Sequence, residues 1–267
     1  MPKYWGKMHK ILHYSFSDLR RSQWSYFYFA FYLIISTSLL FLTSDLSKAV
    51  ITLINIIIVL TPLIGTVFGV MYFYNSREFT ELLLAQPIKH STIFLGQYLG
   101  LSMSLSLSFL LGLGLPFIFY GIFQSSVIWD FIMLLISGVF LNFIFVALAF
   151  NIALSNENRI KGFAYAILVW LFLAVIYDGL FLLFLVAFKD YPIDKVALFA
   201  STLNPIDLSR ILILLKLDIS ALLGYTGAVF QQFFGTGFGL ITSFTVLILW
   251  TIIPVWRIMK KIEKRDF

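Results

Sequence analysis

The sequence predicts an all-α integral membrane protein: six transmembrane helices, an N-terminal amphipathic interfacial helix, both termini cytoplasmic, and two short helices in the last extracytoplasmic loop. The first observation is composition, because 60% of the 267 residues are hydrophobic and only 12% are charged. Soluble domains carry about 25% charged residues. The second is that the apolar residues form runs of the ~20 residues that a spanning helix requires. The third is an uneven distribution of Lys and Arg between the connecting segments.

The N-terminal segment, residues 1–25, has helical periodicity. Trp5, Met8, Leu12, Phe16 and Leu19 recur every three or four residues, and most of the basic side chains fall on the opposite face. This division is typical of a helix that lies along a membrane surface, with its rings in the acyl boundary and its ammonium groups near anionic headgroups. The alternative is a frayed basic tail.

The six predicted spans are continuous apolar stretches. They cover residues 26–44, 49–74, 91–120, 127–154, 162–188 and 237–256. Residues 102–108 alternate Ser with larger apolar residues, as in a strand, but this alternation lies inside a thirty-residue apolar run, so length favours a helix. A β-barrel needs many alternating segments of about ten residues, which this sequence lacks.

The basic residues predict the orientation of these spans. All but five of the nineteen Lys and Arg residues lie in 1–25, 75–90, the short 155–161 connection and the C-terminal segment. Since cytoplasmic loops carry the excess of Lys and Arg, both termini and the 75–90 segment are predicted to be cytoplasmic. The distribution of the basic residues behind the net charge of +6 indicates orientation in a bilayer, so no nucleic-acid partner is expected.

The last extracytoplasmic loop, residues 189–235, is long for a connector. Asn204, Pro205 and Asp207 form an N-cap, a first-turn proline and an acidic first turn, which predict the start of a helix. A second helix is predicted from Asp218 to about residue 234. We expect both helices to lie on or dip into the outer leaflet, either as packing over the span ends or as a docking surface for an extracytoplasmic partner. The docking residues would be Asn204, Pro205, Asp207, Arg210 and Ile213, although Asp207 and Arg210 are spaced to pair with each other.

Asp178 is the acidic residue that the spans place deep in the membrane, next to Tyr177. A carboxylate at the bilayer centre costs roughly 2.5–3.5 kcal/mol or more, so it is expected to face the bundle interior. It is either a hydrogen-bonded structural group or a group that switches protonation. The expected polar partners are Gln97, Asn142, Asn151 and Tyr177.

A ridge of small residues follows the third span at four-residue intervals, which allows close approach of a neighbouring helix. Its members include Gly96, Gly100, Ser104 and Ser108.

Several chemistries have no residues to support them. A phosphate-binding G-x-x-x-x-G-K-[ST] loop is absent, there is no Cys, and none of the three His lies in a span. The pairing of Tyr177 with Asp178 is also found in intramembrane aspartyl proteases, but the second aspartate of that site is missing. We therefore expect no catalytic residue and no bound metal or cofactor on this chain.

The segment from Ser76 to Gly100 resembles the ABC-2 family of ATP-binding-cassette permeases. The family pattern is an acidic start, a short Leu-rich amphipathic helix, a proline, a basic residue and a Gly-led third span. Six residues match it position by position: Glu78, Leu82, Leu83, Pro87, Gly96 and Gly100. The basic C-terminal segment and the six-span layout also fit, so that the resemblance covers residues 1–267 as one transmembrane domain.

The resemblance implies a homodimer in the bacterial inner membrane, with two copies of a separate ATPase subunit that binds ATP and Mg²⁺. The cytoplasmic segment would couple to that ATPase through Glu78, Glu81, Leu82, Leu83, Gln86 and Pro87. A narrower resemblance concerns Asn204–Arg210, residues 221–230 and the Tyr177-Asp178 pair, which are similar to NosY-type permeases. These serve copper-site maturation of nitrous oxide reductase, which implies a periplasmic copper-handling partner.

Three alternatives remain open. The chain is also compatible with an ABC-2 exporter of a lipid, an antimicrobial or another hydrophobic solute. A membrane scaffold without an ATPase partner would have the same composition. An intramembrane enzyme is disfavoured by the missing catalytic pairs.

Overall fold

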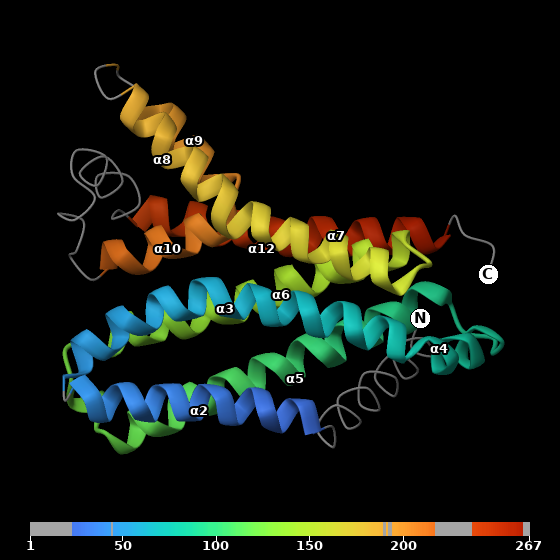
Figure 1. Cartoon of the computed structure of the whole chain (residues 1–267), viewed down its shortest axis with the longest axis horizontal. Coiled ribbons are helices and arrows are strands. Elements are labelled where there is room, and N and C mark those ends of the chain that lie inside the picture. The colour runs from blue at the N-terminus through green and yellow to red at the C-terminus, as the bar shows by residue number, and fades with distance from the viewer. Residues whose placement is uncertain (1–22, 44, 189–190, 192–193, 217–236, 264–267) are drawn as a thin grey trace.

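The computed structural model describes residues 23–43, 45–188, 191, 194–216 and 237–263. Within these ranges every regular element is helical (Figure 1), which confirms the predicted all-α class. Six of the helical stretches are long and apolar enough to cross a membrane, as predicted. The chain is therefore a multi-pass membrane protein.

Each predicted span corresponds to one of these stretches. Five are single helices: α2 (Gln23–Thr43), α3 (Leu46–Asn75), α5 (His90–Phe119), α6 (Ile128–Ser155) and α12 (Gly237–Glu263). The fifth span consists of α7 (Arg159–Leu171), a π-helical segment (Phe172–Ile176) and α8 (Tyr177–Ala187). α12 continues past its predicted end at residue 256. The positive charges of Lys260 and Lys261 in its last turn interact favourably with the negative end of the helix dipole and stabilise the extension.

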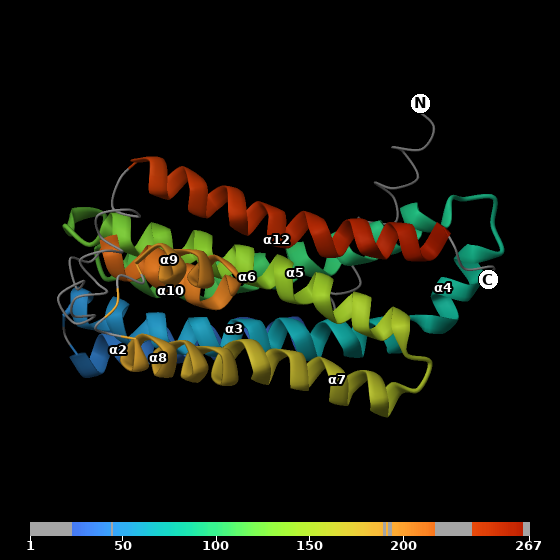
Figure 2. The same ribbon diagram turned by 90° about the horizontal axis from the view of Figure 1, so that it is seen from above.

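Three shorter helices complete the described chain: α4 (Arg77–Leu84), α9 (Asp194–Thr202) and α10 (Pro205–Lys216). α4 lies at the same end of the bundle as the end of α12 and the α6–α7 connection (Figure 2). The α2–α3 and α5–α6 connections lie at the opposite end. Which end faces the cytoplasm stays a prediction from the basic residues.

α6 is the central helix of the bundle and packs against α3, α5, α7, α10 and α12. Small residues let its neighbours approach closely. A Cβ added to Gly69 of α3 would lie 2.6 Å from the Cβ of Ala149 of α6. A Cβ added to Gly112 of α5 would lie 2.8 Å from the carbonyl oxygen of Phe29 in α2. These two glycines therefore set the α3–α6 and α2–α5 spacings.

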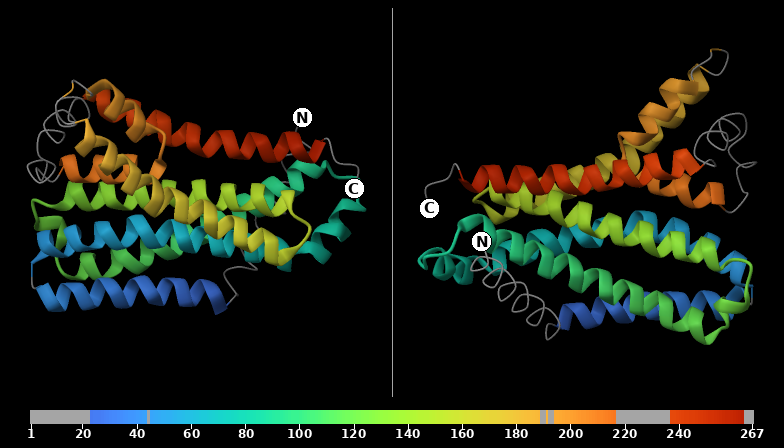
Figure 3. Two further views of the ribbon diagram at one scale, coloured as in Figure 1. Left: turned by 45° about the horizontal axis from the view of Figure 1, so that its top comes forward. Right: turned by 180° about the vertical axis from the view of Figure 1, so that it is seen from behind.

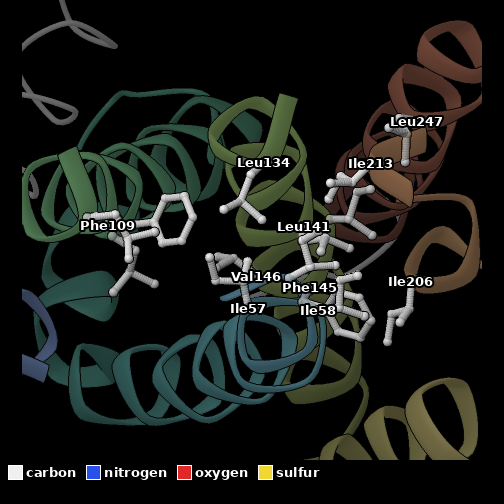
Figure 4. Close-up of a cluster of buried hydrophobic side chains, with 14 of the residues drawn as sticks. Ile57, Ile58, Phe109, Leu134, Leu141, Phe145, Val146, Ile206, Ile213 and Leu247 are labelled. Carbon is white, nitrogen blue, oxygen red and sulfur yellow. The ribbon is translucent and has the colours of Figure 1, made fainter. Parts of the chain in front are cut away.

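α10 is part of the bundle core and packs against α3, α6 and α12. Figure 4 shows Ile206 and Ile213 of α10 pointing toward Phe145 of α6 and Leu247 of α12. Ile206 and Ile213 both have 0% exposure. Of the two roles left open for this helix, packing or partner docking, its burial favours packing, because its apolar residues contact α6 and α12 inside the bundle.

α9 and α10 form a hairpin with a bend of 110° between them. The outer ends of α8 and α9 both project away from the other helices (Figure 3). α8 has no buried residue, in contrast to α6. The start of α10 matches the predicted helix start, whereas α9 was not predicted. The interfacial helix predicted for residues 1–25 and the loop helix predicted from Asp218 lie outside the described residues, apart from residues 23–25, which begin α2.

Candidate functional site

α4 forms directly after α3 and ends before Pro87. The Thr80 hydroxyl donates a hydrogen bond to the carbonyl oxygen of Ser76 at 2.8 Å. Glu78 lies in the first turn, where a negative side chain interacts favourably with the positive end of the helix dipole. The helix ends at Leu84, three residues before the proline. A proline disfavours helical backbone at the residue before it, so the helix ends ahead of Pro87.

One side of α4 is fixed to the bundle. Gln97 of α5, with 1% exposure, donates from Nε2 to Thr80 Oγ1 at 2.8 Å. Thr80 itself is buried, and Leu84 packs against the hydrophobic core. Since both partners of the hydrogen bond are buried, breaking it would leave polar groups unsatisfied. α4 and the start of α5 are therefore expected to move together.

The other side of α4 faces outward. Glu78, Glu81 and Leu82 are exposed, Leu82 by 69%, and Gln86 and Pro87 are exposed just beyond the helix. Leu83 is half-buried, so Leu82 and Leu83 point in different directions. Arg77 pairs with Glu81 at 3.0 Å, but both side chains are about 60% exposed. Such a pair contributes at most about 1 kcal/mol and leaves the face accessible.

The small-residue ridge of α5 runs from this end into the bundle. Gly96, Gly100 and Ser104 are buried, and Ser108 is half-buried. Ser104 Oγ lies 3.4 Å from Ser25 Oγ of α2. The ridge thus continues the contact between α5 and its neighbours from the α4 end to Gly112.

A second polar cluster, which we call the hairpin junction, lies where the α9–α10 hairpin meets the fifth span. Its members are Tyr177, Asp178, Asn204, Asp207 and Arg210. Arg210 donates from one guanidinium nitrogen to Asp178 Oδ2 at 2.8 Å, and the same nitrogen lies 3.8 Å from Asp207 Oδ1. The Asp178 and Arg210 side chains are each about one quarter exposed.

The expected partners of Asp178 were wrong. Gln97 bonds Thr80, Asn142 accepts from Tyr28, and Asn151 donates to the carbonyl of Pro254. Arg210 takes their place because α10 enters the bundle and carries a cation to the fifth span. The alternative pairing of Asp207 with Arg210 exists only at the longer distance, and Asp207 Oδ1 accepts no hydrogen bond from the described residues.

Asn204 joins the hairpin to the π-helical segment. Its Oδ1 accepts from the backbone N–H of Ile206 at 3.0 Å, which caps α10. Its amide Nδ2 donates to the carbonyl of Leu173 at 2.7 Å and to Asp207 Oδ2 at 2.9 Å. A π-helical turn disturbs the regular backbone hydrogen bonds of a helix, and such turns occur often at functional sites. The amide of Asn204 supplies a donor to one carbonyl of that turn.

Two further hydrogen bonds hold the α9 end of the hairpin. Tyr177 donates its hydroxyl to the carbonyl of Ala200 at 2.6 Å. The indole N–H of Trp250, in α12, donates to the carbonyl of Thr202 at 3.1 Å. The hairpin is therefore attached to both the fifth and the sixth span at the 110° bend.

The five residues predicted to dock a partner face mainly inward. Asn204, Asp207 and Ile213 have 0%, 3% and 0% exposure, Pro205 is buried, and Arg210 is half-buried. In this arrangement a partner would reach only Arg210 among them. A docking role for this end of the molecule stays a prediction.

The described residues contain no group of three His, Asp or Glu side chains that could hold a metal ion. No protein-family model matches the chain. No curated protein matches it either. The geometry of α4 and of the hairpin junction therefore provides the structural basis for a functional hypothesis.

Proposed function

We propose that the chain is the membrane-spanning permease subunit of an ABC-2 type transporter, driven by a separate ATPase. The observation that carries the proposal is α4, an amphipathic helix with an exposed acidic face and a buried attachment to α5. This is the geometry that a coupling element needs, because one face is accessible to a partner and the other moves the bundle. The resemblance to ABC-2 permeases at Glu78, Leu82, Leu83 and Pro87 points to the same role for this segment.

The permease would act as a homodimer with two copies of the ATPase, which bind ATP and Mg²⁺. Closure of the ATPase pair would displace α4, and the Gln97–Thr80 hydrogen bond would carry that displacement to α5. α5 packs on α6, and α6 contacts α10 and α12. The route therefore ends at the hairpin junction, where Arg210 and Asn204 connect α10 to the fifth span.

A narrower form of the proposal concerns copper-site assembly of nitrous oxide reductase. It rests on the similarity of Tyr177-Asp178 and Asn204–Arg210 to NosY-type permeases. These two segments lie far apart in the sequence, yet Tyr177, Asp178, Asn204 and Arg210 all belong to the hairpin junction. In this form the junction would relay motion to a periplasmic copper-handling partner. Loss of the chain would then lower the copper content of nitrous oxide reductase in the cell.

The test of the coupling role is the double variant Glu78→Lys with Glu81→Lys. Reversing two exposed charges places like charges against a surface that recognises the acidic face, so we expect the copurifying ATPase to fall about tenfold. The variant should insert and fold normally, because both side chains are exposed.

The control is Glu157→Lys with Glu263→Lys. It makes the same charge change at two exposed positions at the same end of the bundle, outside α4. It should retain the ATPase. If the α4 variant keeps the ATPase and full activity, or if the control loses as much as the α4 variant, α4 is not the coupling element.

A further inference from the structure

A cleft of about 850 Å³ opens between α7 and α12, with α6 as its floor. It is separate from the outward face of α4. Leu148 and Ile152 of α6, Val169 of α7, and Val246 and Ile253 of α12 form its apolar walls. This volume lies within the usual range for ligand sites, about 300–1,000 Å³.

Two cations lie at one end of the cleft. Arg257 and Lys261 are four residues apart on α12, so they share one face of the helix, and both line the cleft. Lys261 donates to Ser155 Oγ of α6, across the cleft floor. No acidic side chain is among the described residues that line it. The site therefore combines an apolar trough with a cationic end.

The position of this end matches a membrane interface. Arg257 and Lys261 belong to the end of the bundle that also holds Lys161 and Lys260 and the α6–α7 connection. Along α12 the lining extends from Val246 to Lys261. Fifteen helical steps correspond to about 22 Å. That is about the thickness of one leaflet including its headgroups, since a bilayer measures about 40–45 Å.

Part of the cleft lining is exposed within the membrane spans. Tyr165 and Ile253, which line the cleft, are 52% and 50% exposed and lie in helices long and apolar enough to cross a membrane. A ligand that reaches the cleft from this side arrives from the hydrocarbon region. Such a ligand needs a long apolar body and one anionic group.

We infer that the cleft binds one anionic glycerophospholipid from the leaflet on the basic side. Its phosphate group lies between Arg257 and Lys261, and an acyl chain follows Ile253 and Trp250 toward Val246. Arg257 supplies a fork of donors that suits phosphate oxygens, and Lys261 supplies a point charge. The inference does not depend on the ABC-2 proposal, because it uses only the cleft and its charges.

The experiment is native mass spectrometry of the full chain, released from detergent after titration with lipid. Phosphatidylglycerol and phosphatidylcholine with identical acyl chains are compared, because they differ in net charge. A third arm uses glycerol phosphate without acyl chains. We expect saturable binding of one phosphatidylglycerol, at least tenfold weaker binding of phosphatidylcholine, and no binding of glycerol phosphate.

The variant Arg257→Gln with Lys261→Gln should weaken phosphatidylglycerol binding about 30-fold, from the usual effect of two basic groups on an anionic headgroup. The control Lys161→Gln with Lys260→Gln removes the same charge at exposed positions outside the cleft and should bind normally. Ile253→Trp keeps both cations but fills the trough, and it should also weaken binding.

Three results would overturn the inference. Equal binding of the two lipids would exclude recognition of the charge. Equal loss in the control variant would reduce the effect to the net charge of that end of the bundle. Binding of glycerol phosphate as tight as that of the lipid would assign the cations to a soluble anion and leave the trough without a role.

Discussion

Removing Arg210 should destabilise the protein more than removing Asp178, although the two residues form one ion pair. After Asp178→Asn, Arg210 still has Asp207 at 3.8 Å. After Arg210→Gln, two carboxylates at the hairpin junction remain without their cation, and one of them, Asp207, is 3% exposed. The two halves of the pair are therefore not equivalent.

The expected loss of unfolding free energy in each variant follows from how deeply the charged groups are buried. Breaking a fully buried pair costs about 3–5 kcal/mol, whereas an exposed pair contributes about 0–1 kcal/mol. The Asp178–Arg210 pair is one quarter exposed, so Asp178→Asn should cost about 1–2 kcal/mol. Arg210→Gln should approach the buried limit, at about 3 kcal/mol or more.

The assay is equilibrium unfolding in mixed micelles, where a mild detergent is titrated with a denaturing one and tryptophan fluorescence is recorded. Trp250 reports on the hairpin because its indole N–H bonds Thr202. The control is Arg77→Gln, which removes the exposed pair of α4 and should cost less than about 1 kcal/mol. Equal losses for Asp178→Asn and Arg210→Gln, or the reverse order, would refute the reasoning about Asp207.

Two further predictions concern the packing and the cap. Gly69→Ala should cost about 1–3 kcal/mol of unfolding free energy, because the added Cβ would overlap Ala149 of the neighbouring helix. Gly114→Ala should be nearly neutral in the same unfolding assay, because no described atom outside its own stretch of helix lies within 4 Å of the added Cβ. Asn204→Ala should lower the free energy of unfolding by about 3 kcal/mol, because it removes the cap of α10 and also the donor to the Leu173 carbonyl. Asn158→Ala removes only the cap of α7 and should cost about 1 kcal/mol. Similar effects of the two members of either comparison would contradict these assignments.

The spans were predictable because each is a long apolar run, and the hydrophobic cost of leaving such a run in water allows no other placement. The start of α10 was predictable from local chemistry, since Asn204 caps the helix and Pro205 occupies its first turn. The end of α4 was predicted only approximately, because Pro87 limits a helix without specifying its last residue.

The tertiary position of α10 was not predictable from its own residues. Its apolar side chains, such as Ile206 and Ile213, form too short a run to indicate a span, and burial depends on a surface offered by α6 and α12. The Asp178–Arg210 pair was missed for the same reason, since the two residues are 32 positions apart and meet only when the hairpin enters the bundle. The strongest available signal was the conflict between a carboxylate in the fifth span and the absence of a local cation.

Some of the functional residues could be predicted from the sequence, and others could not. The acidic face of α4 could be predicted from the sequence, because Glu78 and Glu81 are three residues apart and share one helix face. The exposure of Leu82 could not, since its residue type favours burial. The Gln97–Thr80 attachment could not be predicted either, since neither residue type at these positions indicates a partner. The hairpin junction needed the structure to bring its five residues together.

The most direct test of the central claim is affinity purification of the full chain from its own cells in mild detergent, with identification of every bound subunit. The account predicts one P-loop ATPase at an equal number of copies, a second copy of this chain, and ATP hydrolysis by the purified complex. A chain that purifies without any ATPase, under conditions where its own fold is intact by the unfolding assay, would contradict the proposal and favour a membrane scaffold.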